Sequence, residues 1–154
     1  MKIVDFLNKK TPSISFEVFP PKTAVVFDSV KQAVEKIAQL NPAFMSVTYG
    51  AGGGTSEYTV SIAENIQKNH NVTALAHLSC ISSAKDEVLV QLEKLKATGI
   101  ENILALRGDI PEGFSTEKLD YKYASDLVKE IKKFGGSCIG GACYPEGHHD
   151  RATH

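Results

Sequence analysis

The stretch Ser15-Phe16-Glu17-Val18-Phe19-Pro20-Pro21 begins the pattern that decides the fold, in which a short apolar run ends in polar residues or prolines. Comparable runs end in Ser46-Val47-Thr48-Tyr49-Gly50, Ala76-His77-Leu78 and Leu106-Arg107-Gly108-Asp109, so the pattern returns about every 30 residues. Polar side chains at the carboxyl ends of successive parallel strands are the way in which a (β/α)8 barrel builds an active site. The pattern therefore predicts both a fold and a place for chemistry.

Hydrophobic periodicity predicts strands that alternate with helices along the whole chain. Strands are expected at 14–19, 44–49, 73–78, 102–106 and 137–143, and helices at 2–9, 25–40, 58–69, 85–98 and 123–134. A glycine-rich loop is expected at 50–55, a longer loop at 108–120 and a polar tail at 145–154. Such alternation implies parallel strands joined by right-handed crossovers.

Side-chain alternation within the strands favours a barrel over a doubly wound sheet. In the first strand Phe16 and Val18 share one face, whereas Glu17 lies on the other. The same argument predicts one apolar, helix-covered face that includes Leu104 and Leu106, and an opposite face that holds Ser46, Thr48, Ala105, Arg107, Asp109, Gly140, Ala142 and Tyr144. The central sheet of a doubly wound fold should instead be apolar on both faces.

A full barrel takes about 250 residues, so this chain of 154 residues supplies about the first four and a half βα units. We therefore expect residues 1–154 to be the N-terminal part of a single α/β domain of the TIM-barrel family, and a fragment of a longer protein. The first and last strands would be open edges, which invite pairing with another chain. A homo-oligomer that forms through these edges is expected.

Composition is that of an ordinary globular domain, with 42% hydrophobic and 23% charged residues and a net charge of −1. A basic stripe is absent, which argues against nucleic-acid binding, and no apolar run approaches the roughly 20 residues of a membrane span. The N-terminus lacks the apolar core of a signal peptide, so a cytoplasmic protein is expected. Cys80, Cys138 and Cys143 contain no Cys-x-x-Cys pair and are expected to be reduced.

Glu17 is the leading candidate for acid–base chemistry. Its apolar neighbours in sequence would favour a protonated carboxyl and hence a general acid, although a structural ion pair with an arginine is the alternative. Arg107 and Asp109 could hold an anion and a polar heterocycle, or could pair with each other. Tyr144 could stack on a flat ring or cap the core.

His77 could bind a ligand or be a core residue, and taken alone the core reading is the stronger. His77 and Cys80 fall short of a zinc-ligand set, and His148, His149 and His154 are typical of a polar tail. The glycine-rich loop lets the backbone approach a ligand. It lacks the phosphate-binding motif G-x-x-x-x-G-K-[ST], and no G-x-G-x-x-G follows the first strand, so a Rossmann nucleotide site is not indicated.

Six motifs in order carry a resemblance to a known family. They are Ser-Phe-Glu-Val-Phe-Pro-Pro-Lys (15–22), Ser-Val-Thr-Tyr-Gly-Ala (46–51), Ala-His-Leu-Ser-Cys-Ile (76–81), Leu-Ala-Leu-Arg-Gly-Asp (104–109), Tyr-Ala-Ser-Asp-Leu-Val (123–128) and Ala-Cys-Tyr-Pro-Glu-Gly-His (142–148). Together they closely resemble methylenetetrahydrofolate reductases of the bacterial type, from about Ile14 to His148.

The resemblance implies a (β/α)8 barrel that holds non-covalent FAD at its carboxyl rim. It implies that NAD(P)H reduces the flavin and leaves, and that 5,10-methylenetetrahydrofolate then takes a hydride to give 5-methyltetrahydrofolate. By motif, Glu17 matches the general acid that protonates the leaving ring nitrogen, and Asp109 matches the carboxylate beside flavin and folate. The positions that match flavin contacts are Thr48, His77, Arg107, Gly108, Asp109, Tyr123, Ala124, Ala142, Tyr144 and His148.

Other readings of the sequence stay open beside this one. In the family, the part after the fifth strand supplies further flavin contacts, folate contacts and three barrel strands, so this chain is expected to bind flavin weakly and turn over little. A non-catalytic half-barrel, present as a truncation product or an assembly module, is the alternative. A weaker third reading is a metal-dependent barrel that uses His77, Cys80 and Asp109.

Overall fold

A computed structural model describes the chain except for residues 10, 22, 50–55, 111–112, 114–118 and 148–154. Its strands are β1 (Ser15–Val18), β2 (Phe44–Val47), β3 (Ala74–Ser79), β4 (Asn102–Leu106) and β5 (Cys138–Gly141). Its helices are α1 (Val4–Leu7), the 3-10 turn η1 (Ala24–Val26), α2 (Phe27–Ala38), α3 (Ser56–His70), α4 (Lys85–Ala97) and α5 (Ala124–Phe134).

The predicted alternation of strands and helices is confirmed, with differences at the ends of elements. The helix expected at 25–40 begins as the 3-10 turn η1, and the helix expected at 58–69 begins at Ser56. The strand expected at 137–143 ends at Gly141, because its ladder with β4 ends where Ala105 pairs with Gly141. The glycine-rich loop at 50–55 lies outside the described residues.

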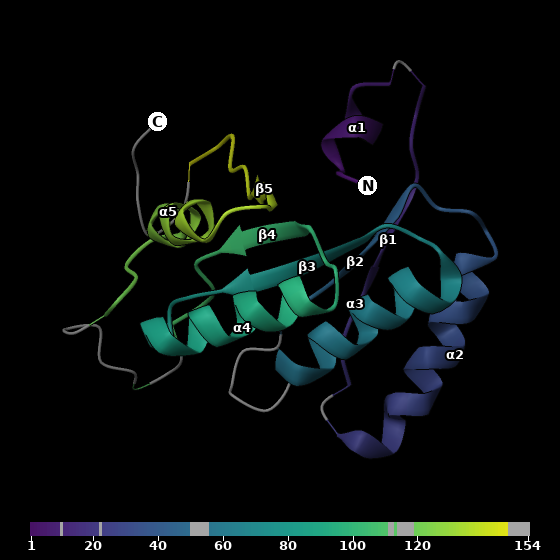
Figure 1. Cartoon of the computed structure of the whole chain (residues 1–154), viewed down its shortest axis with the longest axis horizontal. Coiled ribbons are helices and arrows are strands. Elements are labelled where there is room, and N and C mark those ends of the chain that lie inside the picture. Colours follow the sequence, from purple (N-terminus) through teal and green to yellow (C-terminus); the bar gives the residue numbers. More distant parts are fainter. Residues whose placement is uncertain (10, 22, 50–55, 111–112, 114–118, 148–154) are drawn as a thin grey trace.

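The five described strands form one parallel sheet in the order β1-β2-β3-β4-β5, so each strand pairs with the next one along the chain. A doubly wound sheet reverses its strand order at a switch point, and no such reversal occurs among these strands. Right-handed crossovers that all step in one direction place the helices on one face of the sheet. Figure 1 shows α3 and α4 running along the strands, with β1 at one edge and β5 towards the other.

The hydrophobic core lies between this face and the helices. The strands contribute alternate residues and the helices contribute residues three or four apart, which are the spacings that place side chains on one face. Each fully buried Leu or Ile side chain contributes about 1.5–3 kcal/mol to the stability of the folded chain, relative to an exposed one. The core includes Val18, Met45, Val47, Ala76, Leu78, Ile103, Ala105, Val34, Ile62, Ile66, Val88, Leu92, Leu127 and Ile131.

The predicted orientation of β4 is wrong. Ile103 and Ala105, which are 1% and 0% exposed, lie in the helix-covered core. Leu104 pairs with His77 of β3 and with Gly140 of β5, which places it on the opposite, open face. Both alternating sets of β4 are apolar, so the pattern could not fix which set faces the helices. Since β4 ends at Leu106, strand alternation does not orient the residues that follow it.

Asn102 anchors the N-terminal segment against the amino ends of β3 and β4. The Ile3 amide donates to Asn102 Oδ1 at 2.9 Å, and Asn102 Nδ2 donates to the carbonyls of Met1 and Ala74, each at 3.1 Å. Figure 1 shows the N-terminus and α1 beside the sheet. The amino end of the open face is therefore covered by the start of the chain.

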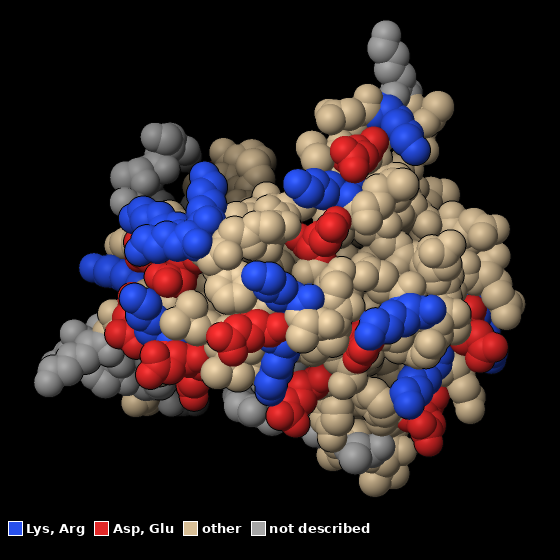
Figure 2. All heavy atoms as spheres, viewed as in Figure 1, with Lys and Arg blue, Asp and Glu red and all other residues tan. Residues whose placement is uncertain are grey.

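Charged side chains of both signs are interspersed on the face in Figure 2, where no broad single-sign patch is visible among the described residues. Several form helix-surface ion pairs, such as Lys68 with Glu64 and Lys94 with Glu57. Among the described residues, no helix has the length and apolar character that crossing a membrane requires.

Candidate functional site

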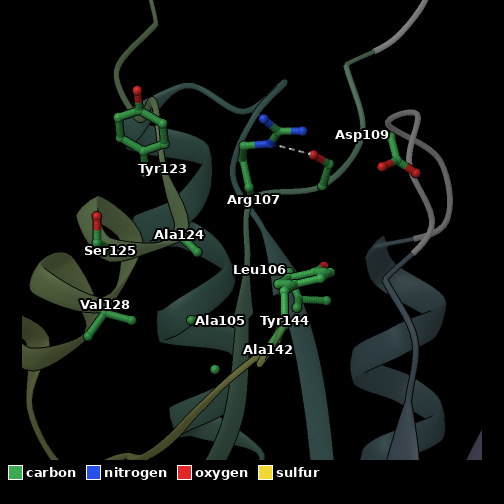
Figure 3. A pocket seen from close by; sticks show the side chains of 12 residues that line it. Ala105, Leu106, Arg107, Asp109, Tyr123, Ala124, Ser125, Val128, Ala142 and Tyr144 are labelled. Atoms are coloured by element: carbon green, nitrogen blue, oxygen red, sulfur yellow. Dashed lines mark hydrogen bonds between the residues drawn. The ribbon is translucent and has the colours of Figure 1, made fainter. Parts of the chain in front are cut away.

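A cavity of about 480 Å³ opens beyond the carboxyl ends of β4 and β5 (Figure 3), a size within the range of small-molecule sites. Ligand sites in parallel α/β folds occur at this edge of the sheet. Its walls come from β4 and the residues after it, the start of α5, and the residues after β5. It is lined by Ala105, Leu106, Arg107, Gly108, Asp109, Tyr123, Ala124, Ser125, Val128, Gly141, Ala142 and Tyr144.

The β4 wall is held by backbone hydrogen bonds from the neighbouring β3–α4 turn. The amides of Cys80 and Ile81 donate to the Arg107 carbonyl at 3.2 and 2.8 Å, and Arg107 Nε donates to the Gly108 carbonyl at 3.1 Å. Gly108 has φ +85°, and a Cβ there would lie 2.7 Å from Ser79 Oγ. The turn into the cavity therefore requires glycine, both for its backbone conformation and for its close approach to β3.

The α5 wall is fixed by Asp126. Its Oδ2 accepts hydrogen bonds from the amides of Tyr123 (3.1 Å) and Lys122 (3.3 Å), and its Oδ1 accepts one from Lys129 Nζ at 3.1 Å. The Lys129 hydrogen bond and the two amide bonds lower the pKa of Asp126, so the capping group is ionised at neutral pH. Figure 3 shows Tyr123 and Ala124 at this end of α5, on one side of Arg107, with Asp109 on the other.

A second polar group lies on the open face of β1, β2 and β3. Glu17 Oε2 accepts a hydrogen bond from Ser46 Oγ at 3.1 Å and lies 3.4 Å from His77 Nε2. The latter distance is an ion-pair distance without hydrogen-bond alignment, since His77 Nε2 has no hydrogen-bond partner. Burial lowers the pKa of His77, and the nearby Glu17 carboxylate partly opposes this.

The expected desolvation of Glu17 is wrong. Its side chain is 47% exposed, because its apolar neighbours Phe16 and Val18 point to the other face of the strand, as alternation requires. The exposed carboxyl stands on the open face of the sheet. It is therefore accessible to a ligand there, without the apolar enclosure that the sequence suggested.

The remaining predicted residues are placed as follows. Thr48 directly follows β2, where its amide donates to the Val18 carbonyl at 3.0 Å and its carbonyl accepts from Thr59 Oγ1 at 2.9 Å. The residues brought together in the cavity are Arg107, Gly108, Asp109, Tyr123, Ala124, Ala142 and Tyr144. Glu17, Thr48 and His77 are not among the cavity's lining residues, and His148 lies outside the described residues.

The interpretation as a metal-dependent barrel finds no geometric support. Within the described ranges, no three His, Cys, Asp or Glu side chains come together as a metal site, so His77, Cys80 and Asp109 do not form one. All three cysteines are free thiols. Burial, reinforced by Asp126, raises the pKa of Cys80 to about 11, which keeps this thiol protonated and unreactive at neutral pH.

Sequence reasoning missed several residues that the structure places at these sites. Ser125 and Val128 line the cavity, and Val128 follows Ala124 by four residues on the same face of α5, which is a signal that helical spacing could have supplied. Ser46 was assigned to the correct face, but its bond to Glu17 depends on the register between β1 and β2. That register is a tertiary property.

The fold and the cavity define a parallel α/β protein with a cavity at the carboxyl ends of its strands, the edge at which proteins of this class bind small molecules. A profile of the family described as "Methylenetetrahydrofolate reductase" matches residues 2–154. The chain belongs to this family.

Individual relatives agree with this membership. Methylenetetrahydrofolate reductase 2 of Schizosaccharomyces pombe is 38% identical over 97% of this chain and 25% of its own length. The 5,10-methylenetetrahydrofolate reductase of Escherichia coli is 38% identical over 88% of this chain and 45% of its length. Methylenetetrahydrofolate reductase (NADH) 1 of Arabidopsis thaliana is 35% identical over 97% of this chain and 27% of its own length. The chain thus spans less than half the length of these curated relatives.

Proposed function

We propose that this chain carries the first part of a flavin-dependent site that reduces 5,10-methylenetetrahydrofolate to 5-methyltetrahydrofolate with electrons from NAD(P)H. Family membership and the names of the relatives support the reaction. The Arabidopsis relative is named for NADH, which makes NADH a candidate donor here. The sequential parallel sheet supports a (β/α)8 barrel, of which residues 1–154 would form the N-terminal units.

The observation that carries this proposal is the cavity that unites Arg107, Gly108, Asp109, Tyr123, Ala124, Ala142 and Tyr144. FAD is a dianionic cofactor with a flat ring system, and when bound it supplies hydride transfer. Arg107 is suited to an anion, and the tyrosine rings are suited to packing against a flat ring. Gly108 lets a ligand approach the backbone closely. Thr48, His77 and His148 would make further flavin contacts.

The two carboxylates have different proposed roles. By its motif, Glu17 would deliver a proton to the folate ring nitrogen as the carbon–nitrogen bond breaks, and its exposed position on the open face makes it accessible to the substrate. Asp109, at the rim of the cavity, would accept hydrogen bonds from the N–H groups of the pterin and orient it beside the flavin. Orientation of this kind lowers the barrier because the reacting groups no longer have to find each other.

A flavin-retention experiment tests this proposal. The purified chain is incubated with FAD and desalted, and its visible absorbance is recorded. Because weak binding is expected, the wild-type chain should retain a minor fraction of the flavin, and Arg107→Ala should retain at least tenfold less. Lys132→Ala removes a positive charge from the exposed surface of α5 and should retain flavin as the wild type does. Loss of flavin from the wild-type chain, or equal retention by Arg107→Ala, would contradict the proposed cavity.

We also propose a cytoplasmic homo-oligomer that forms through β1 and β5. These strands are the edges of the sheet, and open edges present unpaired backbone groups to another chain. Light scattering coupled to gel filtration should give a mass at least twice that of one chain. A monomer at micromolar concentration would contradict the proposed assembly and leave the cavity proposal intact.

A further inference from the structure

The two oxygens of the Glu17 carboxyl have different surroundings. Ser46 Oγ donates to Oε2 at 3.1 Å, and His77 Nε2 approaches the same oxygen at 3.4 Å. No hydrogen bond reaches Oε1 from the described part of the chain. The parallel register pairs Glu17 directly with Ser46, which explains why this hydroxyl, 7% exposed and central in β2, reaches the carboxyl.

We propose that Ser46 is a positioning residue, which pins Oε2 of Glu17 beside His77 and leaves Oε1 as the oxygen that carries the transferable proton. The use of that proton rests on the proposed function, whereas the positioning rests on the geometry alone. A carboxyl on an exposed strand position otherwise rotates freely and presents either oxygen to either side.

The arrangement suits both protonation states of the acid. In the neutral acid the proton is on Oε1, and the carbonyl oxygen Oε2 accepts the Ser46 hydroxyl. When the proton passes from Oε1 to the folate nitrogen, the carbon–nitrogen bond breaks and its electron pair stays on that nitrogen, while the other nitrogen bonded to the same carbon donates its lone pair to form an iminium. The Ser46 bond then continues to a carboxylate oxygen and becomes stronger, because its acceptor is now charged. The acid therefore needs no rotation during the transfer.

His77 does not compete for this proton at neutral pH. Burial lowers its pKa, so the imidazole is neutral there. The residues of β2 and β4 that share its face carry no charge; they are Phe44, Ser46, Asn102, Leu104 and Leu106. Among the described residues, Glu17 is the charged group that faces His77 and raises its pKa. The pKa of His77 therefore reports how close the Glu17 carboxylate is held.

The experiment is an NMR titration of the His77 imidazole in the whole chain, with the resonance assigned by its loss in His77→Gln. Glu17→Gln removes the carboxylate and should lower the pKa of His77 by at least 0.5 units, a threefold change in proton affinity. Ser46→Ala should give at least half of that decrease, because the released carboxylate swings into solvent. Ser46→Thr keeps the hydroxyl and should restore the wild-type value.

Ser79→Ala is the matched control, since Ser79 is 8% exposed and lies on the same face of the neighbouring strand β3. It should leave the pKa of His77 unchanged. The proposal would be overturned if the pKa of His77 were the same in Ser46→Ala as in the wild type, or if Ser46→Thr lowered this pKa as much as Ser46→Ala does. It would also be overturned if Glu17→Gln left the pKa of His77 unchanged. None of these results depends on bound flavin, so they are separable from failure of the flavin-retention test.

Discussion

Replacing Asn102 by alanine should detach the N-terminal segment and destabilise the protein. Asn102 is 1% exposed and makes hydrogen bonds to the Ile3 amide and to the carbonyls of Met1 and Ala74. Ile3 is itself buried, so alanine leaves the Ile3 amide without a partner and without water. A buried group without a partner costs about 1–3 kcal/mol, which is the loss expected here.

The assay is urea denaturation followed by circular dichroism, with amide hydrogen exchange at Ile3 as the local readout. The midpoint should fall while the slope m stays close to the wild-type value, because most of the surface exposed on unfolding is unchanged. Asn69→Ala is the control: it removes one exposed hydrogen bond to Asn65 and should change stability by less than about 0.5 kcal/mol. A loss below about 0.5 kcal/mol in Asn102→Ala, with Ile3 still protected, would refute the reasoning.

Three further outcomes are expected. Because burial lowers the pKa of His77 in the folded state, the unfolded chain binds more protons below about pH 6.5. The urea midpoint should therefore fall as the pH drops through this region, and His77→Gln should flatten the dependence. Gly108→Ala should lower the urea midpoint, because residue 108 has φ +85° and an added Cβ would lie 2.7 Å from Ser79 Oγ. The double variant Gly108→Ala/Ser79→Gly should regain part of this loss. Equal midpoints for the single and the double variant would contradict the steric explanation. Iodoacetamide at pH 8 should modify the exposed Cys143 and spare the buried Cys80, whose pKa is raised to about 11. Mass spectrometry of the peptides measures both modifications, and equal rates at the two cysteines would contradict this prediction.

The alternation of strands and helices was predictable because each element has a local signal. Strand β2 carries the apolar residues Phe44, Met45 and Val47, and α5 repeats apolar residues such as Leu127 and Ile131 at helical spacing. Glycines at Gly99 and Gly135 stand directly after helices or one residue beyond them. These signals do not depend on the rest of the chain, so they predict elements well and their ends less well.

The orientation of β4 could not be predicted because its sequence has no polar alternation to fix it. Both faces of Ile103-Leu104-Ala105-Leu106 are apolar, and the polar Asn102 is buried by the N-terminal segment rather than by the sheet's own helices. The face of a strand with two apolar sides is decided by what packs against each side. Here that is α5 on one side and the open face on the other, which are tertiary facts.

The prediction of an apolar environment for Glu17 failed for a different reason. Its sequence neighbours Phe16 and Val18 are apolar, but adjacent residues of a strand point to opposite faces, so they cannot enclose its carboxyl. The groups that do surround it, Ser46 and His77, are 29 and 60 residues away in sequence. Motif similarity located these residues, whereas only the register between strands shows that they touch.

The cavity wall at β4 and the Glu17 carboxyl at β1 differ in the number and kind of hydrogen bonds that hold them. At the carboxyl end of β4, the Arg107 carbonyl is bound by two amides of the β3–α4 turn, so backbone bonds fix this wall of the cavity. At β1, an edge strand, the carboxyl of Glu17 depends on a single side-chain hydrogen bond from Ser46. A bond to one hydroxyl is lost by one substitution, whereas a wall held by several backbone bonds survives most side-chain changes. Substitutions at Ser46 should therefore alter the acid without altering the cavity.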